Sequence, residues 1–217
     1  MHIEPGTVSA AKVALANAAA ISTLGFYGLQ LLRQRAQLPV TLLRTGLAAV
    51  FFSVFMESFH MPVGPSELHF VGAMAMYLTL GFLPTLFGFA IGLLLQGFLF
   101  EPADLIHLAV NSLSLILPLA AVHAYRARHT VTSLDWQAIV KLDAMYYTGV
   151  TAMVGFWLSI GEEATPLLDW ARFASSYLAV VAVEPLVTLG AIALLKRYQD
   201  SKLLTACFVD VRGSSAA

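Results

Sequence analysis

The first two residues, Met1 and His2, form a potential chelating unit by themselves. The α-amine, the His2 amide nitrogen and the His2 imidazole Nδ1 can bind one metal ion through a five-membered and a six-membered ring. The amide must lose its proton, which Ni²⁺, Cu²⁺ and to some extent Co²⁺ promote. One further imidazole would complete four nitrogens, and tetragonal nitrogen sites suit Cu²⁺ or Ni²⁺. His60 and His69 are the candidates for that imidazole.

This pattern also has ordinary explanations. An N-terminal Met-His pair is common without a metal role, and His60 and His69 are equally consistent with histidines at a membrane surface. Two features favour the metal site. The turn-forming residues 4–6 can fold the terminus back toward the protein. Glu57 and Glu67 flank the histidine loop, and their negative field attracts a divalent cation.

The composition decides which kind of scaffold must position these residues. The chain has 217 residues, of which 59% are hydrophobic and 12% charged. Soluble domains are about 45–50% apolar and about 25% charged, so this chain cannot cover a water-exposed surface, and disorder is excluded as well. The net charge of −1 leaves no basic surplus for a nucleic acid. The single cysteine, Cys207, excludes an internal disulfide and a thiolate metal cluster.

Seven apolar stretches without strand-type alternation predict an all-α, polytopic membrane bundle of about seven transmembrane helices, each span needing ~20 residues. The stretches are 7–32, 41–59, 68–83, 84–100, 105–125, 139–160 and 173–195. The prediction assigns residues 1–200 to a single transmembrane domain and residues 201–217 to a cytoplasmic tail.

The distribution of basic residues predicts the orientation of the bundle. In a bundle of seven helices, the loops after the first, third and fifth stretches lie on the same side as the C-terminus. Ten of the 12 Lys and Arg residues fall on that side. Only Lys12 and Arg172 fall on the other side. Because basic loops stay in the cytoplasm, we expect the N-terminus outside and the C-terminus inside a bacterial cytoplasmic (inner) membrane. No secretory signal is evident at the start, so the free amine is expected to belong to Met1.

Four segments carry a resemblance to a known family. They are MHIEPG at the start, PVGPSELHFVGAMA at 62–75, LLLQGFLF at 93–100 and HLAVNSLSL at 107–115. Together with the expected topology, they resemble the CbiM/NikM permeases. These are the substrate-binding membrane components of energy-coupling-factor transporters for cobalt and nickel. The resemblance covers most of residues 1–125 and continues more weakly to the end.

The resemblance implies a set of metal ligands. In the family, the metal is bound by the amine of the first residue, the amide and imidazole of the second, and a histidine from the loop after the second helix. Carried over, these are Met1, His2 and His69, with His60 as a competing or auxiliary ligand. Asn111 matches a family asparagine and is expected to orient a ligand.

Other residues near the expected site are less closely matched to the family. His107 precedes Asn111 by four residues, shares its helix face, and is expected on the approach of the metal together with Glu67. Residues 101–104 replace a Gly-Gly pair of many members, and Ser114 replaces a second asparagine. Cobalt and nickel therefore both stay open as the divalent substrate, and we expect no permanently bound cofactor.

The expected function is uptake of a transition metal, and we expect no enzyme activity in this chain. It lacks a G-x-x-x-x-G-K-[ST] nucleotide motif. The resemblance therefore implies ATP-binding cassette ATPases as partners, acting through a coupling transmembrane subunit, with a small accessory membrane subunit as a further partner. The alternatives are a non-transporting structural or assembly subunit and a stand-alone metal facilitator.

Small and acidic residues inside the apolar stretches leave several roles open. Ala14 and Ala18 suit docking onto a partner subunit and equally suit internal packing. Gly88 and Gly92 carry the same two interpretations. Glu184, before a proline, is interpreted as the one carboxylate near the middle of a span. It is either a buried acid at a kink or a gating position.

Overall fold

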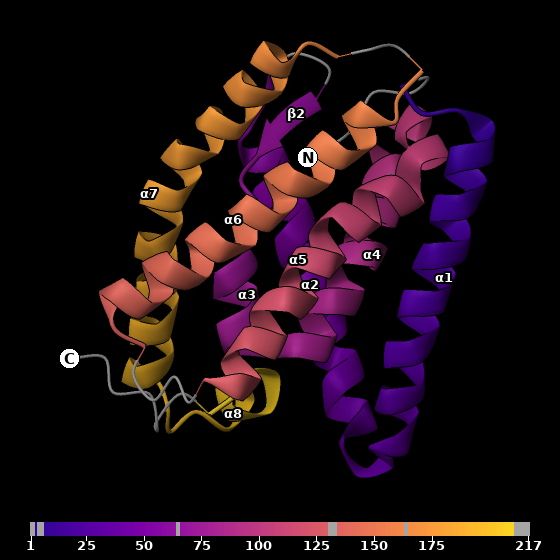
Figure 1. The fold of residues 1–217 in the computed structure, drawn as a ribbon. Coiled ribbons are helices and arrows are strands. Elements are labelled where there is room, and N and C mark those ends of the chain that lie inside the picture. The colour runs from indigo at the N-terminus through magenta and orange to yellow at the C-terminus, as the bar shows by residue number, and fades with distance from the viewer. Residues whose placement is uncertain (1–2, 4–6, 64–65, 130–133, 163–164, 211–217) are drawn as a thin grey trace.

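A computed structural model describes residues 3, 7–63, 66–129, 134–162 and 165–210. Within these ranges the protein is a bundle of long helices with one short β-hairpin (Figure 1). The elements are α1 (Ala10–Arg33), η1 (Arg35–Gln37), α2 (Leu38–Ser58), β1 (His60–Val63), β2 (Ser66–His69), α3 (Ala73–Leu80), α4 (Phe82–Leu99), η2 (Pro102–His107), α5 (Leu108–Arg128), α6 (Trp136–Ser159), α7 (Leu167–Arg197) and α8 (Lys202–Cys207).

Five helices of the described residues are long and apolar enough to cross a membrane, which confirms the predicted class of helical membrane bundle. They are Ala10–Arg33, Arg35–Ser58, Phe82–Leu99, Pro102–Arg128 and Leu167–Arg197. The helix α6 has 24 residues, a length of ~36 Å at about 1.5 Å per residue. It is less apolar because it carries Lys141 and Asp143 near its start.

The third apolar stretch differs from the expected helix over 68–83. There β2 is extended, and α3 has only eight residues, about 12 Å. The connection needs Gly72, whose φ of 65° is left-handed and where an added Cβ would meet the ring of Phe55. The extended segment and α3 together run from one end of the bundle to the other (Figure 1). The apolar run therefore indicated burial correctly, but the prediction of a continuous helix was wrong.

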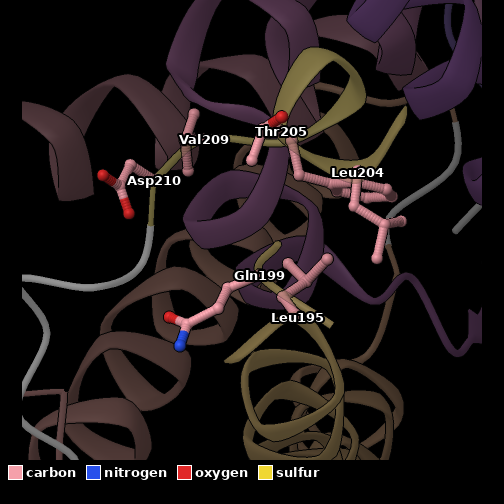
Figure 2. Close-up of a pocket in the computed structure, with 7 residues that line it drawn as sticks. Leu195, Gln199, Leu204, Thr205, Val209 and Asp210 are labelled. Carbon is pink, nitrogen blue, oxygen red and sulfur yellow. The ribbon is translucent and has the colours of Figure 1, made fainter. Parts of the chain in front are cut away.

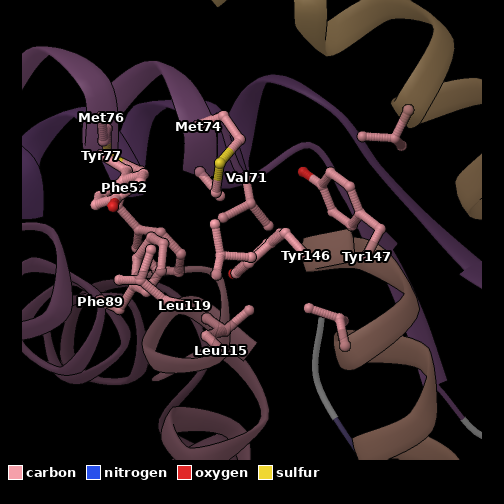
Figure 3. Packing of buried hydrophobic residues seen from close by; sticks show 14 of the residues in the cluster. Phe52, Val71, Met74, Met76, Tyr77, Phe89, Leu115, Leu119, Tyr146 and Tyr147 are labelled. Carbon is pink, nitrogen blue, oxygen red and sulfur yellow. The ribbon is translucent and has the colours of Figure 1, made fainter. Parts of the chain in front are cut away.

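The helices α2 and α4 pack closely through the glycine pair of α4. A Cβ added at Gly88 would lie 3.1 Å from the backbone of Ala48, and one added at Gly92 would meet the ring of Phe52. Phe52 and Phe89 lie together in the buried core, which Figure 3 shows from close by. Of the two interpretations of this glycine pair, the structure therefore supports internal packing.

The two ends of the bundle carry different features. We call the end with β1, β2 and η2 the hairpin end, and the end with η1 and α8 the tail end. At the tail end, the Val209 N–H donates to the Thr79 carbonyl at 2.8 Å, and Arg44 donates to the Phe208 carbonyl. A cavity of about 170 Å³ lies there between the end of α7 and the tail (Figure 2). It is at the opposite end from His60 and His69.

The helix α1 lies at the edge of the bundle, with only 17% of its apolar window buried. Ala16 and Ala20 are buried and pack in a small core with Val110 of α5. Ala14 and Ala18 lie on the exposed side of the helix. The alanines of this helix therefore divide between an internal face and a free face.

Candidate metal centre

The hairpin brings three potential metal ligands onto one face. In the antiparallel register of β1 and β2, His60 lies directly opposite His69. Glu67 precedes His69 by two residues in β2, and residues two apart in a strand point to the same face. Pro62, which has no backbone N–H, lies in β1. The sheet has only two strands, so β1 is an edge strand and tolerates a residue that cannot donate a hydrogen bond. The local sequence thus fixes which side chains share the face.

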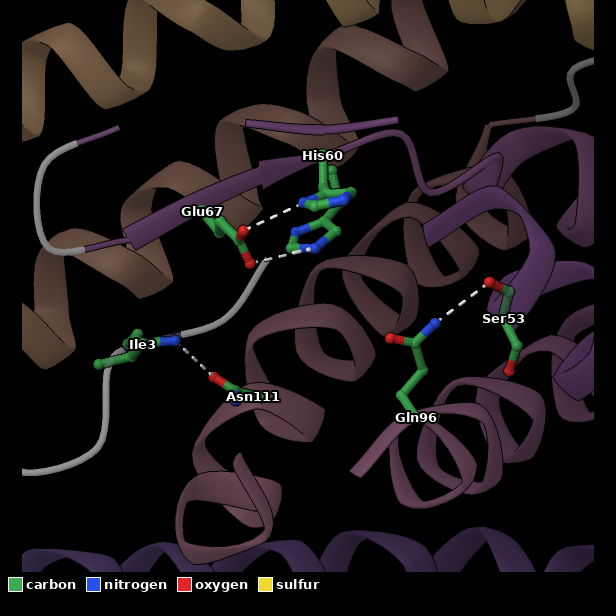
Figure 4. Close-up of polar contacts among 7 residues, drawn as sticks. Ile3, Ser53, His60, Glu67, Gln96 and Asn111 are labelled. Atoms are coloured by element: carbon green, nitrogen blue, oxygen red, sulfur yellow. Dashed lines mark hydrogen bonds and ion pairs between the residues drawn. The ribbon is translucent and has the colours of Figure 1, made fainter. Parts of the chain in front are cut away.

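The carboxylate of Glu67 lies beside the imidazole of His60 (Figure 4) and contacts both histidines, one with each oxygen. Its Oε1 is 3.3 Å from His60 Nδ1, and its Oε2 is 3.4 Å from His69 Nε2. The two rings stack with their centroids 5.9 Å apart. One ligand atom from each of the three residues lies within 4.8 Å of the others. Imidazole and carboxylate donors of this kind bind divalent transition metals.

Burial differs sharply across the cluster. The side chain of His60 is 53% exposed, that of Glu67 24% and that of His69 5%. A cation arriving from solvent would therefore meet His60 first, and His69 would hold it from the interior. On the inner side, the hydroxyl of Tyr177 faces the His69 backbone.

A second set of contacts anchors the chain next to the hairpin at Ile3, which is fully buried. The Ile3 N–H donates to Asn111 Oδ1 at 3.1 Å (Figure 4). The Ile3 carbonyl lies 3.0 Å from His107 Nδ1. Since a carbonyl only accepts, the proton of His107 must sit on Nδ1. Ile3 also forms an isolated antiparallel bridge with Ser66 of β2.

The structure thus brings most of the predicted residues to the hairpin end. His60, His69 and Glu67 form one cluster, so the two candidate loop histidines lie together. Asn111 and His107 both contact the backbone of Ile3. Met1 and His2 lie outside the described residues. One buried carboxylate was missed. Asp143, in the first third of α6, is fully buried and contacts Glu184, so Glu184 has a second buried carboxylate beside it that was not predicted from the sequence.

Asp143 did leave a signal in the sequence. It lies inside the apolar stretch 139–160, where a lone carboxylate is costly unless another buried group contacts it. The hydrophobic pattern alone does not tell which helix supplies that group, because the pattern carries no information about helix–helix contacts.

The fold and the cluster define a polytopic helical membrane protein with a histidine–carboxylate centre at one end. Residues 2–201 match the family model CbiM, described as the cobalt uptake substrate-specific transmembrane region, and the chain belongs to this family. The resemblance drawn from the sequence is thereby confirmed.

The fold also occurs in a solved structure. A chain titled "Crystal Structure of an transition metal transporter" superposes with a TM-score of 0.71 at 18% identity. The match covers 94% of this chain and 96% of the other. No curated protein sequence matches this chain.

Family membership defines the general role of the protein. It is a multi-pass membrane component of metal transport, a role that is not enzymatic. Proteins of this family normally work within a transporter complex.

Proposed function

We propose that this chain is the substrate-binding component of a cobalt or nickel uptake transporter in a bacterial cytoplasmic membrane. It binds the divalent cation at the outer face through the Met1 amine, His2 and His69, and passes it inward. The observation that carries this proposal is the cluster of His60, Glu67 and His69 beside the anchored Ile3 backbone, in a chain of the cobalt uptake family.

The register at Ile3 supports a role for the first two residues. Ile3 bridges Ser66 in the antiparallel direction. If that pairing continues one residue toward the start, position 2 falls opposite Glu67. Directly opposite residues of an antiparallel pair share a face, and Glu67 shares its face with His69. An imidazole from His2 would therefore join the cluster when the metal binds.

Each residue then has a distinct role. His69 is the inner ligand because it is the buried histidine of the pair. His60 is auxiliary, since its side chain is half exposed. Glu67 orients both imidazoles and offsets the charge of the cation. Asn111 and His107 are positioning residues that hold the start of the chain against β2.

The proposed orientation and partners follow from charge and exposure. The tail end carries most Lys and Arg residues and is placed in the cytoplasm, so the hairpin end faces outward. Partner ATPases supply energy through a coupling membrane subunit. The exposed face of α1 with Ala14 and Ala18 is the surface proposed for that subunit. A small accessory membrane subunit is a further proposed partner.

Equilibrium binding of Co²⁺ and Ni²⁺ to the purified full chain tests the ligand set. We expect tight binding with the native start, and a large loss on extension before Met1, in His2→Ala and in His69→Ala. His60→Ala should lose less. His129→Ala, at an exposed histidine of the tail end, is the matched control and should bind normally. Equally tight binding by the extended protein would refute the amine chelate.

Vesicle uptake separates the remaining alternatives. A transporter component moves metal only with its partner ATPases and ATP, whereas a stand-alone facilitator moves it without them. A structural or assembly subunit would bind no metal at all. The three functional classes thus give three different results with the same protein.

A further inference from the structure

Two carboxyl groups meet deep in the bundle, away from the metal centre. Asp143 of α6 and Glu184 of α7 are both fully buried, and their side chains are within hydrogen-bonding reach of each other. Glu184 accepts the Met74 N–H at 2.9 Å and the hydroxyl of Tyr147. Figure 3 shows Tyr147 reaching from α6 toward the start of α3, where Met74 lies.

The contact between the two acids lacks a donor. An ionised carboxylate only accepts hydrogen bonds, so two of them in contact cannot bond to one another. Both oxygens of Asp143 are buried without a donor among the described residues. The hydroxyls of Tyr146 and Thr188 are also buried without a partner among the described residues, but each carries its own proton. The Asp143 oxygens, buried against Glu184 with no donor, are therefore what points to a missing proton.

The charges around the pair support one proton rather than none. Among the described residues, the partners of the two acids are the other acid, a tyrosine hydroxyl and backbone N–H groups, and none of them is cationic. Two adjacent ionised carboxylates that are both fully buried repel each other and are costly to hold in the charged form. One shared proton makes their contact a charge-assisted hydrogen bond. The single remaining negative charge then faces the N-terminus of α3, where the helix dipole favours an anion.

We propose that Asp143 and Glu184 form an intramembrane proton-binding site that holds one proton between them. Proton uptake converts the Asp143 carboxylate to the acid, which donates to Glu184, and the charge of the pair changes from −2 to −1. Within the described part of the chain, the other titratable groups facing the pair are Tyr146 and Tyr147 from α6 and Tyr177 from α7. The site itself does not depend on the proposed function.

The proton site is connected to the metal centre through a short segment of chain. Met74, whose N–H is bound by Glu184, follows His69 by only five residues. Between them, Gly72 takes a left-handed conformation that no other residue adopts without strain. The protonated pair therefore fixes the start of α3, and through it the position of His69. This connection, unlike the proton site, rests on the proposed function.

Infrared spectroscopy of the full chain in lipid vesicles tests the site, because a buried carboxylic acid absorbs apart from an ionised carboxylate. At pH 7 we expect one such band in the wild type, and its loss in Asp143→Asn. The asparagine amide replaces the acid as donor to Glu184, so folding is retained. Glu184→Gln should lose the band as well. Asp169→Asn, which removes a carboxylate paired with Arg172 at 3.2 Å, should keep it.

The wild-type spectrum decides the matter even if the variants fail to fold. Absence of a protonated carboxyl at pH 7 would overturn the proposal, and so would a band that persists in folded Asp143→Asn. Co²⁺ binding tests the connection separately. Glu184→Leu, which frees the start of α3, should bind Co²⁺ more weakly than Asp143→Asn. If the wild type binds no Co²⁺, the proposed function fails while the band still reports on the proton site.

Discussion

Replacing Asn111 by Ala tests whether the anchored start of the chain is needed for metal binding. The substitution removes the oxygen that accepts the Ile3 N–H at 3.1 Å. Asn111 and Ile3 are both buried, at 1% and 0% exposure, so water cannot replace the lost acceptor. A buried donor left without a partner costs about 1–3 kcal/mol.

This energy sets the expected loss of affinity. If the metal binds only when Ile3 is held against β2, the full cost is transferred to binding, and affinity falls by about 5- to 150-fold. Asn111→Asp keeps an oxygen at the same place and should lose much less. The assay is equilibrium titration of Co²⁺ and Ni²⁺ into the purified protein.

A matched control separates loss of the anchor from general destabilisation. Gln96 of α4 is also a buried amide, 4% exposed, and its Nε2 donates to the Ser53 carbonyl of α2 at 3.1 Å. Gln96→Ala therefore removes a comparable hydrogen bond that does not involve Ile3, and it should lower the unfolding temperature without weakening metal binding. Unchanged affinity in Asn111→Ala, or equal losses in both variants, would refute the reasoning.

Three further predictions concern the cluster, the helix packing and the tail. Glu67→Gln removes the charge that contacts His60 and His69 and should weaken Co²⁺ binding by about 10- to 100-fold in the same titration; Glu57→Gln removes an exposed charge outside the cluster and should weaken it far less. Gly88→Val forces α2 and α4 apart and should cost about 1–3 kcal/mol in denaturant unfolding; Gly25→Ala, whose added Cβ meets nothing within 4 Å, should not destabilise. Phe208→Ala removes a partly buried ring stacked on Phe51, about 1–2 kcal/mol of tail docking, and should speed protease cleavage before α8; Leu203→Ala, at a residue 73% exposed, should not.

Much of the candidate site was predictable because its chemistry is local. His60, Glu67 and His69 lie within ten residues of one another, so any compact loop brings them close. Asn111 and His107 were recognisable as polar groups on one helix face within an apolar stretch. The membrane class followed from composition, because too few charges are present to cover a surface in water.

The packing of distant segments was not predictable in the same way. The stretch 68–83 is mostly apolar, and an apolar run of this kind does not distinguish an extended segment followed by a short helix from one continuous helix. The contact between Ile3 and Asn111 joins residues 108 positions apart. The role of the Gly88 and Gly92 pair depended on which helix lay against it.

The sequence by itself determined which side chains are present, how they are spaced along each element, and that the elements must lie in a membrane. These properties follow from local chemistry and from the cost of exposing apolar surface to water. Only the tertiary structure decided that Ile3 is held beside the hairpin and that Asp143 meets Glu184. Contacts of this kind depend on how whole helices pack, and hydrophobic pattern specifies that a face is buried but not which partner covers it.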